Sequence, residues 1–253
     1  MLTAAGRQSG VMSTAAALIS APSAVVSQDL RLTRGGRELL AGIDLTVAPG
    51  ETVAVLGTGA DSGAPRALLE VVAGLAVPAA GWIHWGGHDL LRLTDSAMSA
   101  LRRRDVGIAL DATAALPELP VLQNIALPLL LDGLSHRAAV SRAADLLDTI
   151  GLSGAGARRV GDLSDRDRAL VALGRALVTE PALVVVDDPT ANLSTDETAE
   201  VLDLLIAGCA RIDAALLLAT ARARTAATCA RTVVISGGRI ATREVLYAPQ
   251  ALL

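Results

Sequence analysis

The sequence predicts one α/β domain that joins antiparallel strands near the N-terminus to a core of buried parallel strands. Residues 24–33 and 43–47 alternate apolar and polar side chains, which is typical of antiparallel strands with one buried face. Residues 52–56 and 182–186 are short, continuous apolar runs, as expected for strands that are covered on both faces. With 253 residues, the chain has the ordinary size of a single domain.

The composition supports a large core and argues against binding to nucleic acid by charge. Hydrophobic residues make up 52% of the chain, yet it contains two Trp, one Tyr and no Phe, so Leu, Val and Ala must build the core. The formal net charge of −4 disfavours electrostatic attraction to nucleic acid. No Lys occurs in the sequence, although phosphate-binding loops normally use one.

Cysteine, histidine and long apolar segments give no sign of a metal site or a membrane span. Cys209 and Cys229 lack metal-ligand spacing and are expected to be reduced cytosolic thiols, and the three His residues form no cluster. No apolar run approaches the roughly 20 residues that span a bilayer. Residues 14–26 have some character of a weak secretory segment, but we expect residues 1–23 to form a flexible N-terminal extension.

The remaining elements follow from periodicity and from turn residues. Turns are predicted at 34–37 and 48–51, and hairpins around Gly86-Gly87 and Gly237-Gly238. Residues 115–135 are expected to form short apolar helices broken by prolines. A further strand is predicted at 214–219, and helices are predicted at 67–75, 91–103, 137–150, 163–178 and 197–209.

A glycine-rich loop between the strand at 52–56 and the helix at 67–75 has the layout of a phosphate-binding loop. Residues 57–66 read GTGADSGAPR, whereas the usual pattern is G-x-x-x-x-G-K-[ST]. In that pattern, glycines let backbone N–H groups wrap the phosphates, Lys neutralises them and the hydroxyl binds Mg²⁺. Counting back from Ala73-Gly74-Leu75 places Pro65 at the Lys position and Arg66 at the hydroxyl position, in a loop two residues longer than usual. The candidate nucleotide-binding residues are Gly57, Thr58, Gly59, Ser62, Gly63 and Arg66.

Two interpretations of this loop remain open. Pro65 removes a backbone N–H, and Asp61 adds negative charge where phosphates would lie, so the segment can be a strand–turn–helix without nucleotide. Arg66 offers a cation in the same loop, although its planar fork differs from the compact ammonium group of Lys.

The stretch 163–196 resembles three consecutive motifs of an ABC transporter ATPase. Leu163-Ser164 and Gly174-Arg175-Ala176-Leu177 match the signature helix, Asp187-Asp188-Pro189-Thr190 matches the end of the Walker B strand, and Asn192-Leu193-Ser194 matches the D-loop. The spacing is kept without a gap. Residues 115–135 resemble the lipoprotein-release and macrolide-export type, in which this region receives a coupling helix from the membrane subunit.

The resemblance covers about residues 24–245 and implies a P-loop NTPase (ABC ATPase) fold. That fold has an N-terminal antiparallel β-subdomain, a parallel-sheet core and an inserted helical subdomain, here at about 112–175 of a single domain 24–253. The family also implies ATP and Mg²⁺ as ligands, and the replaced residues of this chain put their binding in doubt.

The resemblance assigns roles to single positions. Asp187 would hold Mg²⁺ through water, and Asp188 stands where the family has its catalytic Glu. Asp111 replaces the Q-loop Gln, Ala221 replaces the switch His, and Asn192 belongs to the D-loop. The signature positions are Leu163, Ser164, Asp165, Arg166 and Asp167, so the glycines of that motif are also replaced.

The polar residues of the signature also have a purely structural explanation. Ser164 followed by Asp167 predicts a helix cap of the S-x-x-D type. We further expect Asp61, Asp165 and Asp167 to fill the vacated anion sites, as partners of backbone N–H groups.

Three functional hypotheses follow from these observations. The first is a degenerate ATP-binding subunit with weak or no hydrolysis, cytoplasmic at the inner face of the cell membrane. It would be docked on a permease and paired with a second ABC ATPase subunit that is competent. The second is an active ATPase that uses Arg66 and Asp188 in place of the usual Lys and Glu. The third is a scaffold or regulatory protein outside transport.

Overall fold

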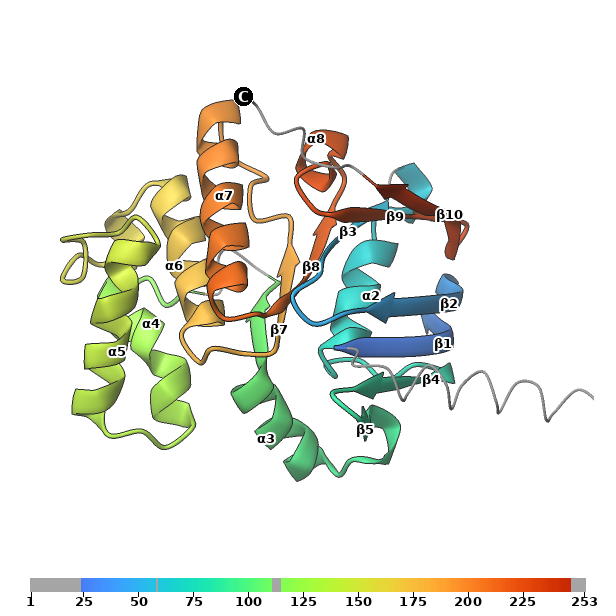
Figure 1. Cartoon of the computed structure of the whole chain (residues 1–253), viewed down its shortest axis with the longest axis horizontal. Helices are drawn as coiled ribbons and strands as arrows, with labels where there is room; N and C mark the ends of the chain where they lie inside the picture. The colour runs from blue at the N-terminus through green and yellow to red at the C-terminus, as the bar shows by residue number, and fades with distance from the viewer. Residues whose placement is uncertain (1–23, 58, 111–114, 247–253) are drawn as a thin grey trace, which may run out of the picture.

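The computed structural model describes residues 24–57, 59–110 and 115–246, and the backbone alone for the last five of these. Its first sheet is antiparallel and has the strand order β2-β1-β4-β5 (Figure 1). The strands are β1 (Val25–Arg34), β2 (Arg37–Val47), β4 (Ala80–Trp85) and β5 (His88–Asp89). The alternation predicted this sheet correctly, but β2 begins six residues before the predicted 43–47, because its pairing with β1 continues up to the tight turn at Gly35-Gly36.

The second sheet forms the core of the molecule and has the order β10-β9-β3-β8-β7-β6. Five neighbouring strands are parallel, and β10 pairs antiparallel to β9 at one edge. The predicted parallel core is therefore confirmed. Its strands are β3 (Thr52–Gly57), β6 (Val106–Ala109), β7 (Leu183–Asp187), β8 (Ala215–Thr220), β9 (Arg231–Ser236) and β10 (Arg239–Leu246).

Side chains of the parallel strands alternate between two hydrophobic clusters. In β7, Leu183 and Val185 face one cluster, while Val184 and Val186 face the other. The first cluster lies between the two sheets and includes most of α2 (Ala64–Val72). Both faces of β7 are therefore buried, which explains why its sequence is a continuous apolar run rather than an alternating one.

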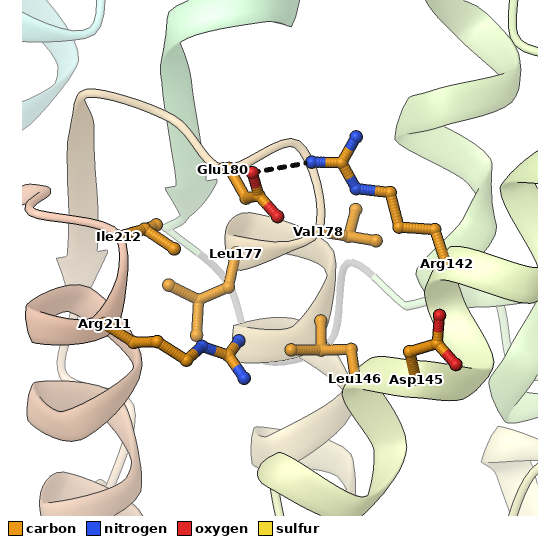
Figure 2. Close-up of a pocket in the computed structure, with 8 residues that line it drawn as sticks. All are labelled: Arg142, Asp145, Leu146, Leu177, Val178, Glu180, Arg211 and Ile212. Atoms are coloured by element: carbon orange, nitrogen blue, oxygen red, sulfur yellow. Dashed lines mark ion pairs between the residues drawn. The ribbon is translucent and has the colours of Figure 1, made fainter.

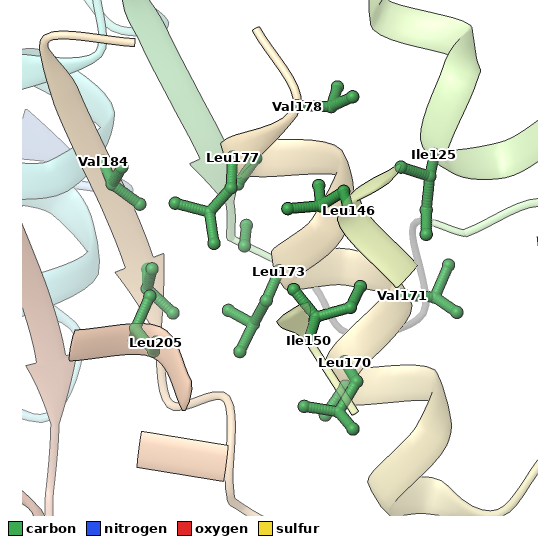
Figure 3. Close-up of a cluster of buried hydrophobic side chains, with 14 of the residues drawn as sticks. Ile125, Leu146, Ile150, Leu170, Val171, Leu173, Leu177, Val178, Val184 and Leu205 are labelled. Carbon is green, nitrogen blue, oxygen red and sulfur yellow. The ribbon is translucent and has the colours of Figure 1, made fainter. Parts of the chain in front are cut away.

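Helices cover the other face of the parallel sheet. The helix α6 (Asp165–Leu177) packs on β6, and α7 (Thr195–Arg211) lies beside it. Beyond them lie α4 (Val121–Leu131) and α5 (His136–Thr149), as Figure 1 shows. Figure 3 shows the buried contact, in which Leu173 and Leu177 of α6 lie between the helical side chains and those of β7 and α7.

Several helix boundaries differ from the prediction. The helix expected at 91–103 is α3 (Asp95–Asp105), because Thr94 caps it and residues 90–92 form a separate 3₁₀ turn. Residues 115–135 contain one helix, α4, rather than several, since Pro120 stands before it and Pro128 lies inside it. The loss of one N–H at Pro128 is tolerated where α4 packs on α5 and α6.

The described part of the chain contains no helix that is both long and apolar enough to cross a bilayer. The short helix α8 (Ala223–Ala226) lies between β8 and β9. The expected extension at 1–23 lies outside the described residues, and the division into a subdomain at about 112–175 remains a prediction.

Candidate functional site

The loop after β3 folds back tightly on Gly57. A Cβ atom added to Gly57 would lie 2.6 Å from the carbonyl oxygen of Asp61 and 2.7 Å from Cδ of the Pro65 ring. The loop contains a 3₁₀ turn at Gly59–Asp61, and α2 begins at Ala64. This side of Gly57 is thus occupied by a carbonyl oxygen and an apolar ring. Thr58 lies outside the described residues.

Arg66 makes three polar contacts with three different segments. Its Nη1 donates to Oδ2 of Asp187 at 2.8 Å and to the carbonyl oxygen of Leu110 at 2.7 Å. Its Nε donates to Oε1 of Glu70 at 3.1 Å. Partial burial alone would lower the pKa of the guanidinium, but the hydrogen bonds to Asp187 and Glu70 outweigh it, and the pKa is raised. Arg66 is therefore a permanent cation held on the Walker B carboxylate.

Asp187 is the last residue of β7 and Asp188 follows it, at the carboxyl ends of the parallel strands, where β3 also ends. Burial raises the pKa of the Asp187 carboxyl, and the contact with Arg66 only partly opposes this change. Burial also raises the pKa of Asp188, against the opposing charge of Arg222. Asp188 has a φ of 36°, a left-handed conformation that is uncommon for Asp, and its buried Oδ1 has no hydrogen-bond partner among the described residues.

The segment after β8 contacts the segment after β7 through an arginine that the sequence motifs did not single out. Arg222 follows Ala221, the residue at the switch-His position, and its Nη1 donates to the carbonyl oxygen of Thr190 at 2.7 Å. Its Nη2 donates to the carbonyl oxygen of Ala191. Asn192 lies exposed in the same D-loop segment. Ala221 itself brings no titratable group to the site.

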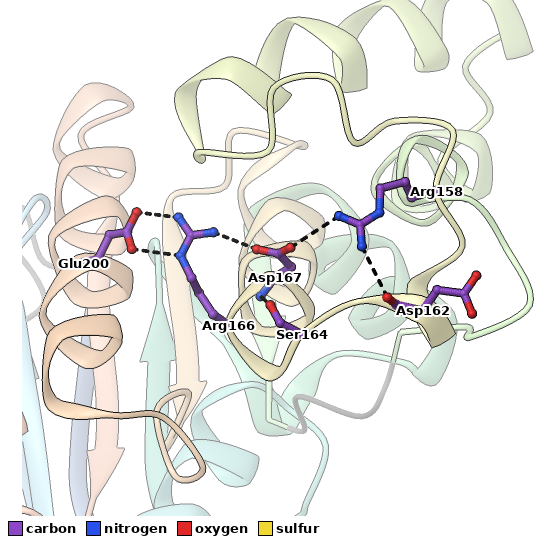
Figure 4. A network of polar contacts seen from close by, with 6 residues as sticks. All are labelled: Arg158, Asp162, Ser164, Arg166, Asp167 and Glu200. Carbon is purple, nitrogen blue, oxygen red and sulfur yellow. Dashed lines mark hydrogen bonds and ion pairs between the residues drawn. The ribbon is translucent and has the colours of Figure 1, made fainter.

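The signature residues form a separate polar network at the start of α6, drawn in Figure 4. Ser164 caps the helix, since its Oγ accepts from the backbone N–H of Asp167 at 3.1 Å, as the S-x-x-D pattern predicted. Arg166 pairs with Asp167 at 2.7 Å and reaches across to Glu200 of α7. Arg158 lies 3.8 Å from Asp167. Leu163, which precedes the cap, is buried.

The carboxylates do not fill anion sites in the way that the sequence suggested. Asp165 pairs with the Arg168 side chain, and Asp167 pairs with arginines, rather than with backbone N–H groups of the helix. Asp61 does accept a backbone N–H, but it is that of Gly237 in the β9–β10 turn, at 2.9 Å, and not one of its own loop. The carboxylates pair with guanidinium groups in preference to backbone N–H groups, because a cation stabilises a carboxylate more than a neutral donor does.

The structure therefore brings Arg66, Asp187 and Asp188 together at the carboxyl ends of the parallel strands, with Gly57 beside them. The sequence did not identify Glu70 or Arg222 as parts of this group. The one signal for Glu70 was its i,i+4 spacing from Arg66. Gly59, Ser62 and Gly63 are exposed parts of the same loop, and Asp111 lies outside the described residues. Within the described residues, no three His, Cys, Asp or Glu side chains are grouped as a metal site.

A cavity of about 530 Å³ lies away from these motifs, between α5, the end of α6 and the end of α7 (Figure 2). An ion pair of 2.9 Å between Arg142 and Glu180 crosses one side of it. Among the described residues, Leu177 at the end of the signature helix is the one motif residue that lines this cavity, and the group around Arg66 and Asp187 lies elsewhere.

Comparison with known proteins agrees with the motifs. The sequence family described as ABC transporter matches residues 40–191. The lipoprotein-releasing system ATP-binding protein LolD of Geobacter metallireducens is 34% identical over 203 residues, which cover 80% of this chain and 89% of that protein. The LolD protein of Ruegeria pomeroyi is 37% identical over 213 residues, which cover 84% of this chain and 92% of that protein.

Solved structures support the fold at lower identity. A dimeric ATP-binding cassette in a post-hydrolysis state, bound to ADP and Pi, has a TM-score of 0.78 and 22% identity. The match covers 88% of this chain and 99% of the solved chain. The P-loop NTPase fold of the ABC type is thereby confirmed. Since the matched family region spans more than half of the sequence, this chain belongs to the ABC transporter family, as an ATP-binding subunit similar to those of lipoprotein-releasing systems.

Proposed function

We propose that this chain is a degenerate ATP-binding subunit, with weak or no ATP hydrolysis, that docks on a membrane permease and pairs with a second cassette. It would work at the inner face of the cell membrane as a regulatory or structural member of a transporter. The observation that carries the proposal is the ion pair between Arg66 and Asp187.

The residues at the carboxyl ends of the parallel strands do not fit a magnesium–nucleotide complex. In P-loop enzymes, Mg²⁺ is held by the loop hydroxyl and by the Walker B Asp. Here the hydroxyl position is Arg66, a donor-only cation that cannot ligate a metal, and it already lies on the Asp187 carboxylate. Pro65 at the Lys position supplies no charge to neutralise phosphates. Both features oppose a bound triphosphate.

The residue at the position of the catalytic base is equally unsuited to hydrolysis. Asp188 is one methylene shorter than Glu, and a misplacement of about 1 Å can reduce a rate by roughly 10²-fold. Its carboxyl is half-buried with a raised pKa, and one of its oxygens has no partner among the described residues. With Ala221 at the switch position, that position carries no imidazole to contact a phosphate.

Two adjoining cavities support docking on a membrane subunit. One, of about 290 Å³, lies between α3, β6, α4 and α6, and the other, of about 360 Å³, lies between α2, β4 and α3. They share Ser99 and Arg102 and are otherwise mostly apolar. Val77 and Leu131, which line them, are 81% and 66% exposed, so the two cavities present adjoining apolar side chains at the surface. We propose an apolar cytoplasmic helix of the permease as the occupant.

Calorimetry tests the nucleotide part of this proposal. The full chain titrated with ATP and Mg²⁺ should give no binding heat, whereas the LolD protein of Geobacter metallireducens serves as a positive control. Micromolar binding by this chain would contradict the degenerate site. If ATP turnover also appeared and Asp188→Asn abolished it, the active-ATPase hypothesis would replace the present one.

Co-purification tests the docking part. The tagged chain is purified from native membranes in mild detergent, and the multi-span membrane protein that is recovered with it is quantified. Val77→Asp and Leu131→Asp should each reduce recovery of the permease, because a charge in an apolar groove is costly to bury. Ala207→Asp is the control, since Ala207 is exposed on α7, lies outside residues 115–135 and lines neither cavity. Equal recovery with all three variants would argue against the groove.

A further inference from the structure

We propose that the Arg66 guanidinium is a built-in substitute for the divalent cation of a nucleotide site, and that it permanently joins segments which a bound metal–nucleotide complex would otherwise join. This inference deepens the proposed function and rests on it. It concerns what this arginine does for the protein, whereas the proposed function concerns what the protein does not bind.

The geometry of the contacts is that of a cation surrounded by oxygen atoms. One guanidinium group gathers a carboxylate oxygen of β7, a backbone carbonyl oxygen after β6 and a carboxylate oxygen of α2. Asp187 of this set is 20% exposed and Glu70 is 16% exposed, so both carboxylates are largely withdrawn from water. A hard metal ion would demand oxygen ligands in the same way, but the planar fork of Arg satisfies them with N–H donors.

Charge explains why some cation is needed at this place. Asp187, Asp188 and Glu70 are close enough that Asp188 and Glu70 both act to raise the pKa of Asp187. Arg66 opposes that effect through a hydrogen bond and through its charge. Arg34 contributes a second positive charge on Glu70, at 2.6 Å, but it does not contact Asp187. Among the described residues, Arg66 is therefore the cation that neutralises the Walker B carboxylate of Asp187.

The contact with Leu110 gives this substitution a structural consequence. Leu110 directly follows β6 and precedes Asp111, the residue at the Q-loop position. The strands β6 and β7 already pair in the sheet as far as Ala109 and Val186. Because Arg66 holds the Leu110 carbonyl and the Asp187 carboxylate with the same nitrogen, it also links the residues that directly follow this pairing, without any ligand. The ends of these two strands should then keep one arrangement whether or not nucleotide is present.

A double-mutant cycle tests the ion pair. Arg66→Met should lower the thermal midpoint by about 4 °C at neutral pH, in line with the usual sensitivity of a domain of this size. Adding Asp187→Asn to that variant should restore at least half of the loss, because the unpaired carboxylate is removed. The same cycle on Arg104 and Asp105, an exposed pair at 2.5 Å, is the control and should show no such rescue. Additive effects at Arg66 and Asp187 would overturn the inference.

Hydrogen exchange and magnesium give readouts beyond stability. Arg66→Met should speed amide exchange in β6 and at Leu110 relative to β1. Arg66→Ser restores a hydroxyl beside Asp187, so millimolar Mg²⁺ alone should raise the midpoint of this variant but not of the natural chain or of Arg66→Met. If Mg²⁺ raised the midpoint of the natural chain as much as that of Arg66→Ser, the proposal that Arg66 replaces the divalent cation would be contradicted. Calorimetric binding of ATP would overturn the proposed function instead, and the cycle would still decide the role of Arg66.

Discussion

The carbonyl oxygen of Thr190 accepts a hydrogen bond of 2.7 Å from Nη1 of Arg222, which ties the segment after β7 to the segment after β8. Thr190 is fully buried, and its hydroxyl has no hydrogen-bond partner in the described residues. Backbone hydrogen bonds also hold this segment, from the N–H of Asp188 to the carbonyl oxygen of Ala219 and from the N–H of Ala191 to that of Asp188. Arg222, which follows β8, adds a side-chain contact to the D-loop segment, as Arg66 adds one directly after β6.

Replacing Arg222 with Met should loosen this segment. The change removes two hydrogen bonds to backbone carbonyl groups, and leaving a buried acceptor unpaired typically costs about 1–3 kcal/mol in the free energy of unfolding. The pKa of Asp188 should also rise further, because the charge of Arg222 now lowers it. Urea denaturation measures the first effect. Arg224→Met is the control, since Arg224 is exposed on α8, and equal losses for both variants would contradict the role of Arg222.

Asp188→Asn should stabilise the protein at neutral pH. Burial raises the pKa of Asp188 in the folded state above its ordinary value of 3.8, so the folded protein favours the protonated carboxyl. The protonated carboxyl of Asp188 therefore stabilises the folded state relative to the ionised one. This contribution is fully present below the unfolded pKa and is lost as the pH rises through the folded pKa. Asn also tolerates the left-handed φ of 36°, as Asp does, so the change adds no backbone strain. We therefore expect Asp188→Asn to increase the free energy of unfolding at pH 7.

The pH dependence distinguishes this effect from a simple change in packing. Because Asp188 becomes protonated in acid, the gain from Asp188→Asn should shrink towards zero as the pH falls below the ordinary pKa of 3.8. Denaturation curves across this range provide the measurement. A gain that stays constant with pH would show that the charge of Asp188 is not the cause.

Much of the fold could be predicted because local patterns and long-range packing agree. The apolar run at 182–186 predicts a doubly covered strand, and β7 does separate two clusters with alternate side chains. The cap at Ser164 depends on residues only three positions apart, so the sequence contains it in full. Pro128 is an exception, because the local rule predicts a break whereas packing keeps α4 continuous.

The site could be predicted only in part. The order of the motifs located Asp187 and Asp188, but the partners of Arg66 could not be found, because Asp187 lies 121 positions away and a long arginine side chain can point in many directions. The same holds for Arg222 and Thr190, which are 32 positions apart. The sequence singled out Asp165, Arg166 and Asp167 as signature positions, but it did not predict their pairing, because charged side chains can pair with any of several close partners.

Removing the cap of α6 should have a measurable but moderate effect. Ser164→Ala leaves the backbone N–H of Asp167 without its acceptor, which typically costs about 1 kcal/mol. Ser96→Ala is the control, because Ser96 is exposed in the first turn of α3 and Thr94 supplies the cap there. Chemical denaturation of both variants measures the difference. A loss no larger than that of Ser96→Ala would indicate that the arginine network alone fixes the start of α6.

Two glycines should respond to alanine in opposite ways. Gly63 precedes α2 with a φ of −87°, and an added Cβ would meet no atom within 4 Å, so Ala fits without strain. Gly63→Ala should raise the free energy of unfolding by about 0.4–1 kcal/mol, because Ala has fewer conformations to lose on folding. Gly107 of β6 is different, since an added Cβ would collide with the carbonyl oxygen of Ala176 in α6.

Gly107→Ala should therefore destabilise the protein by about 1–3 kcal/mol or more, as overpacking at a rigid backbone contact does. The contrast between the two glycines is informative because a loop that wraps phosphates needs its glycines for backbone conformation and close approach. Gly63 is free of that requirement in this protein, whereas Gly107 is required by packing alone. If urea denaturation showed equal losses for the two variants, the loop at 57–66 would have to be held in a conformation that only glycine allows, and a relaxed loop without phosphate would be ruled out.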